Sequence, residues 1–88
     1  MAVKLPTTIR KENLGSVRLI IATFDGTVSS NDLDNADTWA TGITSIIGNP
    51  WFAGAVFVGL AVDPVTGIVT ATTAGTATGT VYVLCKDM

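Results

Sequence analysis

The sequence contains no histidine, and it has no lysine or arginine between Arg18 and Lys86. Histidine is the side chain that exchanges a proton near neutral pH, so its absence removes the usual general acid and base. This long stretch also has no cationic side chain to bind a phosphate group or to stabilise an oxyanion. Its ionisable side chains are aspartates, one cysteine and one tyrosine. The composition therefore predicts that the chain is not an enzyme and binds no cofactor, and it favours packing and self-association instead.

A single cysteine, Cys85, excludes an intrachain disulfide, and no cluster of cysteine and histidine exists to bind zinc. A single cysteine, placed in the apolar run VYVLC, fits a buried side chain in a protein assembled in a reducing cytosol. The sequence also lacks the glycine-rich phosphate-binding motifs and the nucleophile elbow of hydrolases. We therefore predict no catalytic residue.

Asp32, Asp34 and Asp37 have the spacing D-x-D-x-x-D, which invites comparison with a calcium-binding loop. An EF-hand loop that began at Asp32 would need an oxygen ligand at its fifth position, glycine at its sixth and glutamate at its twelfth. These positions hold Ala36, Asp37 and Ile43. The pattern fails, so we predict no metal site and interpret the three aspartates as turn and cap residues of a solvated loop.

Charged residues are also scarce, because they make up 14% of the 88 residues against 48% hydrophobic residues. A chain of this length forms one domain, which buries only about 60–65% of the surface that its unfolded form exposes. Small domains gain stability from disulfides, metals or oligomerisation, and the first two are not expected here. Since so few charges leave a lone small domain short of solvating surface, we predict a homo-oligomer.

The few charges are unevenly distributed. Residues 1–18 carry four cations and Glu12, a net charge of +3, whereas the remaining residues carry six aspartates and Lys86, a net charge of −5. An acidic body argues against nucleic acid as a partner, since phosphate binding needs clustered cations. The cations near the N-terminus either solvate that segment or contact an acidic neighbour. Those that we take as candidate contacts are Lys4, Arg10 and Lys11.

The segment from Thr38 to Val62 has no charged residue and is long enough to span a bilayer. Asn49-Pro50 lies near its middle and would interrupt a helix, and no lysine or arginine flanks the segment to set a topology. We therefore expect no membrane, with a small membrane protein as an alternative.

Short apolar runs separated by glycine-rich turns predict a mainly β fold, a small antiparallel β-sandwich or barrel. Residues 1–15 are predicted to be an extended N-terminal arm, and residues 16–88 the β-sandwich or barrel domain. The strand expected first has apolar residues on both faces, so we expect cover from a second sheet and from a neighbouring subunit. The expected strands are residues 16–24, 41–47, 55–62, 68–73 and 80–86, with a short helical turn after the first and a hairpin loop at residues 63–67.

Three large aromatic residues lie in or beside predicted loops, namely Trp39, Trp51 and Phe52. Aromatic side chains presented together can stack on a sugar or a base, but in a chain with few aromatics they more often anchor a core or an interface. We favour the core or interface interpretation, with a carbohydrate-binding module as an alternative. Trp51 and Phe52 are adjacent on an extended segment, so they should face opposite sides, one toward the core and one toward a neighbour.

Four segments carry a resemblance to a known group of proteins. They are RKENLGSVRLIIATF, the polar loop that ends in DTWATGI, the hairpin DPVTGIVTATTAGTATG and the final strand TVYVLCK. In composition and strand order the chain resembles the small virion structural proteins of tailed bacteriophages, in particular the head decoration or cement proteins. The likeness covers most of the chain, which lies at the short end of the size range of such proteins.

The resemblance implies a non-enzymatic structural protein with a β-rich fold, often a homotrimer, that binds the major capsid protein at local threefold positions and stabilises the phage head. It implies a location on the capsid surface of the virion, after assembly in the host cytoplasm. A tail or fibre component is the alternative within the same class. The resemblance itself carries no functional residue. The candidate subunit or capsid contacts come from the residue patterns above and are Lys4, Arg10, Lys11, Trp39, Trp51 and Phe52.

Overall fold

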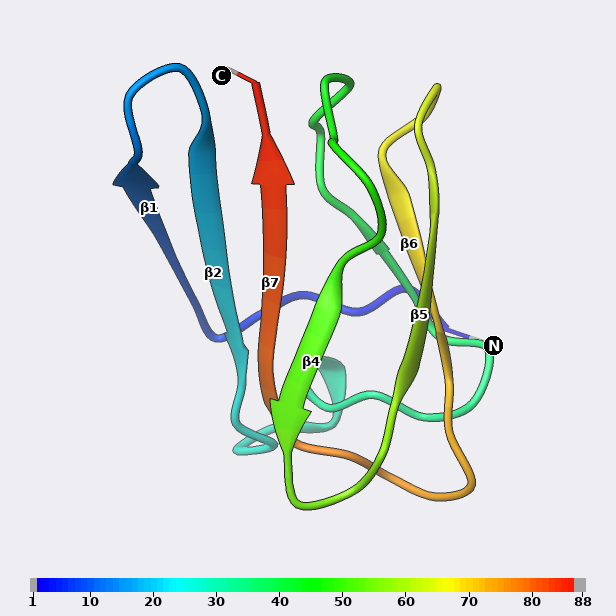
Figure 1. Cartoon of the computed structure of the whole chain (residues 1–88). Helices are drawn as coiled ribbons and strands as arrows, with labels where there is room; N and C mark the ends of the chain where they lie inside the picture. The colour runs from blue at the N-terminus through cyan, green and yellow to red at the C-terminus, as the bar shows by residue number, and fades with distance from the viewer. Residues whose placement is uncertain (1, 87–88) are drawn as a thin grey trace.

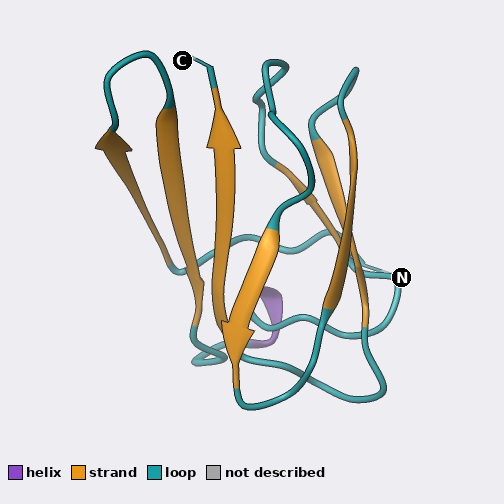
Figure 2. Cartoon of the chain, viewed as in Figure 1, coloured by secondary structure: helices purple, strands orange, loops and turns teal. Residues whose placement is uncertain are grey.

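Within residues 2–86, the part of the chain that the computed structural model describes, seven β-strands form two antiparallel sheets packed as a small β-sandwich (Figures 1 and 2). The larger sheet has the order β1-β2-β7-β4 and the smaller sheet the order β3-β6-β5. The predicted mainly β class is confirmed. The strands are β1 (Thr8–Asn13), β2 (Arg18–Phe24), β3 (Thr38–Ala40), β4 (Trp51–Gly54), β5 (Gly59–Asp63), β6 (Ile68–Thr72) and β7 (Gly79–Cys85), and η1 (Ser29–Asn31) is a single 3-10 turn.

The core lies between the two sheets and is built by strand alternation. In β2 and β7 every second side chain is buried, so one face of each strand packs against the smaller sheet. The ring of Phe24 meets the ring of Trp39 edge to face, with the ring centroids 5.7 Å apart. The buried apolar side chains are Ile20, Ala22, Phe24, Val81, Val83 and Cys85 in the larger sheet, Trp39, Val69 and Ala71 in the smaller sheet, and Leu33, Ile43, Val58 and Ala77 in the connecting segments.

Three of the five predicted strands agree with the structure, because β2, β6 and β7 occupy the segments expected for the first, fourth and fifth strands. The strand predicted at residues 55–62 is displaced. β5 begins only at Gly59, and the preceding residues 51–54 form β4 in the other sheet. The chain needs the residues between β4 and β5 to cross from the larger sheet to the smaller one (Figure 1).

The strand predicted at residues 41–47 is wrong. Gly42 has a φ of 74°, which turns the chain away from an extended path, and the hydroxyl of Thr41 is hydrogen-bonded to the neighbouring hairpin. The segment keeps only an isolated bridge between Ile46 and Cys85. The strand that pairs with β6 lies earlier, at β3.

In the described part of the chain, no helix is long and apolar enough to cross a bilayer.

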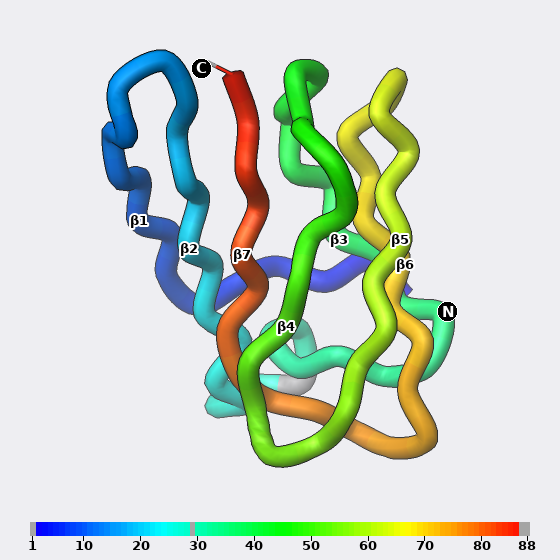
Figure 3. The backbone as a smooth tube through the Cα atoms, in the orientation of Figure 1, coloured from blue at the N-terminus to red at the C-terminus, as the bar shows by residue number. Residues whose placement is uncertain are grey.

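The predicted arm, residues 1–15, is hydrogen-bonded to both sheets. β1 pairs with β2 along its whole length, and the segment before it crosses the sandwich to reach the smaller sheet (Figure 3). There the N–H of Lys4 donates to the carbonyl of Thr38 (N···O 2.7 Å), and the N–H of Thr38 donates to the carbonyl of Ala2 (N···O 2.8 Å). Residue 1 of the predicted arm and residues 87–88 of the predicted domain lie outside the described residues.

The folded chain has the surface area of a compact monomer. Its accessible area is 4851 Å², and a monomer of 9.1 kDa is expected to expose about 4,900 Å². The radius of gyration is 12.0 Å, which also matches the value of about 12 Å expected for a chain of this length. The amount of exposed surface is therefore ordinary for a monomer of this size. Any driving force for self-association must come from the chemistry of that surface.

Gly67 closes the β5–β6 hairpin where another loop presses against it. Its φ is 74°, in the left-handed region that favours glycine. Its carbonyl accepts hydrogen bonds from the N–H of Thr41 (N···O 3.1 Å) and from the hydroxyl of the same residue (O···O 2.6 Å). A β-carbon at residue 67 would collide with the carbonyl oxygen of Ile43. Gly42 has the same φ of 74°, but nothing lies within 4 Å of the β-carbon that it would carry.

The two glycines make a matched pair for a stability measurement. Gly42→Ala should lower the free energy of unfolding by about 1–2 kcal/mol, the cost of a left-handed backbone for an L-residue. Gly67→Ala should cost about 1–3 kcal/mol more, because the backbone around Ile43 must move. Urea denaturation of each variant measures both values. Equal losses would show that the loop containing Thr41 does not clamp the hairpin.

Candidate functional site

Lys4, predicted to be an arm cation that is solvated or contacts a neighbour, is buried among three aspartates. Its side chain is 6% exposed. The Lys4 Nζ atom lies 2.5 Å from Asp32 Oδ1 and 3.0 Å from Asp37 Oδ2. It lies 3.6 Å from Asp34 Oδ2, at the half-exposed side of the cluster. The ammonium group is therefore not accessible to another molecule, and its charge is balanced within the chain.

Asp37 fixes this cluster through backbone donors. Its Oδ1 accepts a hydrogen bond from the N–H of Ala2 (N···O 2.9 Å), and its Oδ2 accepts one from the N–H of Asp34 (N···O 2.7 Å). Asp34 in turn accepts a hydrogen bond from the hydroxyl of Thr76. The Lys4 cluster, which we define as Lys4, Asp32, Asp34 and Asp37, thus ties the N-terminal segment to the loop before β3 and to the β6–β7 loop.

The three carboxylates of the cluster also satisfy the distances of a metal site, since one oxygen of each lies within 4.8 Å of the others. The ammonium of Lys4 already lies among these oxygens and donates a hydrogen bond to Asp32. A lysine that neutralises the carboxylates from the inside gives the cluster a structural explanation. We therefore interpret it as an internal ion-pair network that fixes the loops, and we propose no ligand for it.

The cluster shifts the pKa of its two most deeply buried members. Burial on its own would lower the pKa of Lys4, but the hydrogen bonds and charges of Asp32 and Asp37 outweigh burial, so the pKa of Lys4 is raised. Burial would likewise raise the pKa of Asp37, but the N–H groups of Asp34 and Ala2, together with Lys4, hold that pKa below its usual value. Both groups are therefore charged over the whole neutral range.

The larger sheet carries large apolar side chains on its outer face as well as on its inner face. Leu19 and Ile21 in β2, and Leu84 in β7, point away from the core and are only partly buried. Trp51 in β4 is 49% exposed, and its ring stacks on that of Tyr82 with centroids 5.4 Å apart and planes 9° apart. An antiparallel sheet with one solvated face normally alternates apolar and polar residues. This outer face, the side of the larger sheet away from the core, breaks that rule.

Arg10 and Glu12 supply the charge on the outer face, at its β1 edge. They lie opposite Ile21 and Leu19 in the ladder, with Arg10 Nε 3.6 Å from Glu12 Oε2 and side chains that are 72% and 50% exposed. Such an exposed pair contributes little to stability, about 0–1 kcal/mol. Lys11 lies opposite Ile20 in the ladder and is exposed at the same edge.

The candidate contact residues fall into two groups. Lys4 and Trp39 are buried within the chain, and Phe52 packs against the core as a partly buried residue. Arg10, Lys11 and Trp51 are exposed, although they lie on opposite edge strands of the larger sheet. The prediction that Trp51 and Phe52 face opposite sides is confirmed, with Phe52 directed toward the core and Trp51 away from it.

The sequence patterns did not single out the side chains that make up most of the outer face, namely Leu19, Ile21, Tyr82 and Leu84. The signal for them was present, because the first and last predicted strands are apolar at consecutive positions. The expectation of cover on both sides of the first strand used that signal. The expectation of cover on both sides was not extended to the last predicted strand, β7, which pairs with β2 over seven residues.

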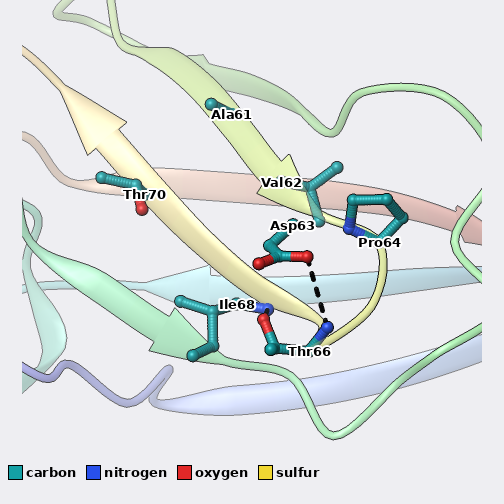
Figure 4. Close-up of a pocket in the computed structure, with 7 residues that line it drawn as sticks. All are labelled: Ala61, Val62, Asp63, Pro64, Thr66, Ile68 and Thr70. Atoms are coloured by element: carbon teal, nitrogen blue, oxygen red, sulfur yellow. Dashed lines mark hydrogen bonds between the residues drawn. The ribbon is translucent and has the colours of Figure 1, made fainter.

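A shallow hollow of about 590 Å³ lies on the β5–β6 hairpin (Figure 4). Among the residues that line it, Asp63 is the one with an ionisable side chain. Its Oδ1 accepts hydrogen bonds from the N–H of Val65 (N···O 2.9 Å) and from the N–H of Thr66 (N···O 3.4 Å). This carboxylate shapes the turn, as an aspartate at the start of a tight turn commonly does. The hollow therefore brings together no acid and base pair for catalysis.

No protein-family model, curated protein or solved structure matches this chain. The fold, the outer face and the Lys4 cluster are therefore the observations on which a functional proposal rests.

Replacing Lys4 by methionine tests the cluster. Lys4→Met should lower the free energy of unfolding by about 3–5 kcal/mol, because it leaves the buried carboxylate of Asp37 without its cation. Lys11→Met makes the same change on an exposed side chain of β1 and should cost less than about 0.5 kcal/mol. Thermal and urea unfolding measure both. A small effect in both variants would mean that the cluster does not tie the loops.

The same cluster predicts a pH dependence. Because the pKa of folded Asp37 lies below its ordinary value of 3.8, its contribution to stability is present above that pH and is lost as the pH falls further. Because the pKa of folded Lys4 lies above its ordinary value of 10.5, its contribution is present below that pH and is lost as the pH rises further. Urea midpoints should therefore form a plateau between these limits. At neutral pH the Lys4→Met protein should have a lower urea midpoint than the wild type. This difference in urea midpoint should become smaller in acid, since protonation neutralises the unpaired carboxylates. A difference that is constant from neutral to acid pH would contradict this account.

Proposed function

We propose that this chain is a non-enzymatic virion structural protein, a head decoration or cement protein of a tailed bacteriophage that self-associates and stabilises the capsid. The observation that carries the proposal is the apolar outer face of the larger sheet. Contiguous exposed apolar surface on a small soluble domain marks an interaction site. A protein whose task is to join subunits needs such a face and needs no reactive group.

The segments that carry the resemblance to phage decoration proteins form the frame of the sandwich, which supports a structural role. RKENLGSVRLIIATF forms the β1–β2 hairpin, and DTWATGI forms β3 and the loop that clamps Gly67. DPVTGIVTATTAGTATG forms the β5–β6 turn, β6 and the loop before β7, and TVYVLCK forms most of β7.

Within the described residues, the aspartates of the body serve as acceptors that hold loops, which also supports the proposal. Asp25 Oδ1 accepts hydrogen bonds from the hydroxyl of Thr7 (O···O 2.7 Å), and from the N–H (3.0 Å) and the hydroxyl (2.9 Å) of Thr27. The bond from Thr7 is the main cause that lowers the pKa of Asp25. Asp63 and the aspartates of the Lys4 cluster are used in the same way. Acidic side chains committed to turns in this way serve structure and leave the surface chemically inert.

The partner that we propose is the major capsid protein, contacted by a homotrimer at local threefold positions. A trimer engages several sites at once, so each contact can be weak. The avidity of the trimer can exceed the affinity of a single contact by about 10²–10⁴. Lys11 remains exposed on β1 and can face an acidic capsid surface, whereas Arg10 lies on the outer face, where it can contact a neighbouring subunit. The two ends of the sandwich add exposed apolar side chains, because Phe57 in the β4–β5 loop is 86% exposed and Val65 in the β5–β6 turn is 80% exposed.

Two other functions fit some of these observations. A tail or fibre component would need the same self-association and differs in its place in the virion. Carbohydrate binding is favoured by the exposed ring of Trp51, but sugar-binding pockets also need convergent polar groups. Tyr82 lies beside Trp51 on the neighbouring strand. Ala53 lies two residues further along β4, on the same face as Trp51. We therefore rank the decoration protein first.

Purified virions test the proposal. The protein should be present in virions of the phage that encodes it, at a copy number comparable with that of the major capsid protein, as measured by quantitative mass spectrometry. Heads assembled without its gene should rupture at a lower temperature, and adding the purified protein should restore their stability. A copy number far below that of the capsid protein would indicate a tail or fibre component, and absence from virions would refute the proposal.

A further inference from the structure

The outer face of the larger sheet is organised in three rows that cross its strands. The ladder register sets Ile21, Tyr82 and Trp51 side by side in the middle row, and Leu19 and Leu84 side by side in the next. The row of Leu19 and Leu84 continues onto Ile47, which is 37% exposed. The N–H of Ile47 donates a hydrogen bond to the carbonyl of Leu84 (N···O 2.8 Å). From β1 outward the rows are Thr8, Thr23, Thr80 and Ala53; Arg10, Ile21, Tyr82 and Trp51; and Glu12, Leu19, Leu84 and Ile47.

This face supplies about half of the area that a stable subunit contact buries on each partner. The larger sheet has four strands, which lie about 4.8 Å apart and have about six residues each, with a rise of about 3.4 Å per residue. Its whole outer face, polar positions included, therefore projects an area of about 400 Å². Exposed apolar patches of about 300–600 Å² on small proteins are often functional. A stable interface buries about 800 Å² on each partner, which is one sixth of the 4851 Å² that this chain exposes. The outer face supplies about half of that area, so the side chains around it must contribute the rest of the contact.

Charge also favours this face over the rest of the surface for contact with another copy. Its charged side chains are Arg10 and Glu12, which form a pair, so the face has no net charge. With that pair set aside, the rest of the chain carries a net charge of −2, and the outward side of the smaller sheet carries Asp63 opposite Ile68. Two copies of an acidic surface repel each other, whereas two copies of a neutral face do not.

We propose that a second copy of this chain covers the outer face of the larger sheet, by sheet-on-sheet packing centred on Ile21, Tyr82 and Leu84 and anchored by Trp51. The inference rests on the self-association in the proposed function and names the surface that performs it. Trp51 is a suitable anchor because a half-exposed tryptophan stacked on a tyrosine is a rigid apolar surface, the kind of side chain that dominates binding energy. A face that packs on the same face of another copy closes a pair of subunits, whereas in the proposed trimer it packs on a different surface of the next copy. The measured mass distinguishes the two arrangements.

A matched pair of charge substitutions tests the proposal. Sedimentation velocity of the wild type over a dilution series should show an oligomer at micromolar concentration. Ile21→Lys introduces a charge at the centre of the outer face and should raise the dissociation constant by at least about 30-fold. Ile68→Lys makes the same change on the outward side of the smaller sheet and should leave the dissociation constant unchanged. A monomeric wild type, or equal effects of the two substitutions, would overturn the proposal.

Cross-linking keeps the test decisive if Ile21→Lys fails to fold. Ala53→Cys places a thiol on the outer face beside Trp51, and Val65→Cys places one in the β5–β6 turn, away from it. A short bismaleimide should join subunits of the Ala53→Cys protein and not those of the Val65→Cys protein. Efficient joining through residue 65 alone would overturn the proposal.

The failures of the two proposals are distinguishable. If Ile21→Lys is monomeric while the wild type self-associates, and virions contain none of the protein, the surface stands and the decoration function falls. If the wild type is monomeric in solution but Ile21→Lys no longer binds virions, the capsid protein covers this face and the self-association proposal falls.

Discussion

The pairing of β2 with β7 is the constraint on which the rest of the structure depends. These strands are the two central strands of the larger sheet, joined in register over seven residue pairs, and each is apolar on both faces. The smaller sheet covers the inner face and so creates the core. Sheets that are apolar on both sides are found covered on both sides. The core and the proposed subunit contact therefore depend on the same two strands.

The Lys4 cluster explains how a short chain with small loops holds a single arrangement around this pair. The N-terminal segment reaches the smaller sheet, where the ammonium of Lys4 meets three carboxylates and Asp37 accepts two backbone N–H groups. A buried ion pair gives little net stability, but removing one partner is costly, so such a network selects one geometry. The cluster holds charged side chains and loops inside the chain, and the apolar outer face is the surface that we propose for the subunit contact. That is what a protein that joins subunits requires.

β2, β6 and β7 could be predicted because each is a continuous β-branched or apolar run between turn residues. β1 could not be predicted, because TIRKEN has no apolar periodicity and forms a strand only where β2 offers a free edge. The strand expected at 41–47 failed because Gly42 turns the chain and Thr41 is hydrogen-bonded to the distant Gly67. Lys4 was assigned to the surface for the same kind of reason, since its partner Asp32 lies 28 residues away. The orientations of Trp51 and Phe52 followed from local geometry alone, whereas the burial of Trp39 depends on the packing of two sheets.

In the proposed subunit contact, a second copy of this chain covers the outer face. Hydroxyl-radical footprinting read by mass spectrometry over a dilution series tests it most directly. Oxidation of Trp51 and Tyr82 should be low at high concentration and should rise as the oligomer dissociates. Phe57, which is 86% exposed in the loop between β4 and β5, should be oxidised equally throughout, and buried Trp39 should stay protected. Oxidation of Trp51 that is high and independent of concentration, while the protein is shown to be oligomeric, would contradict the account.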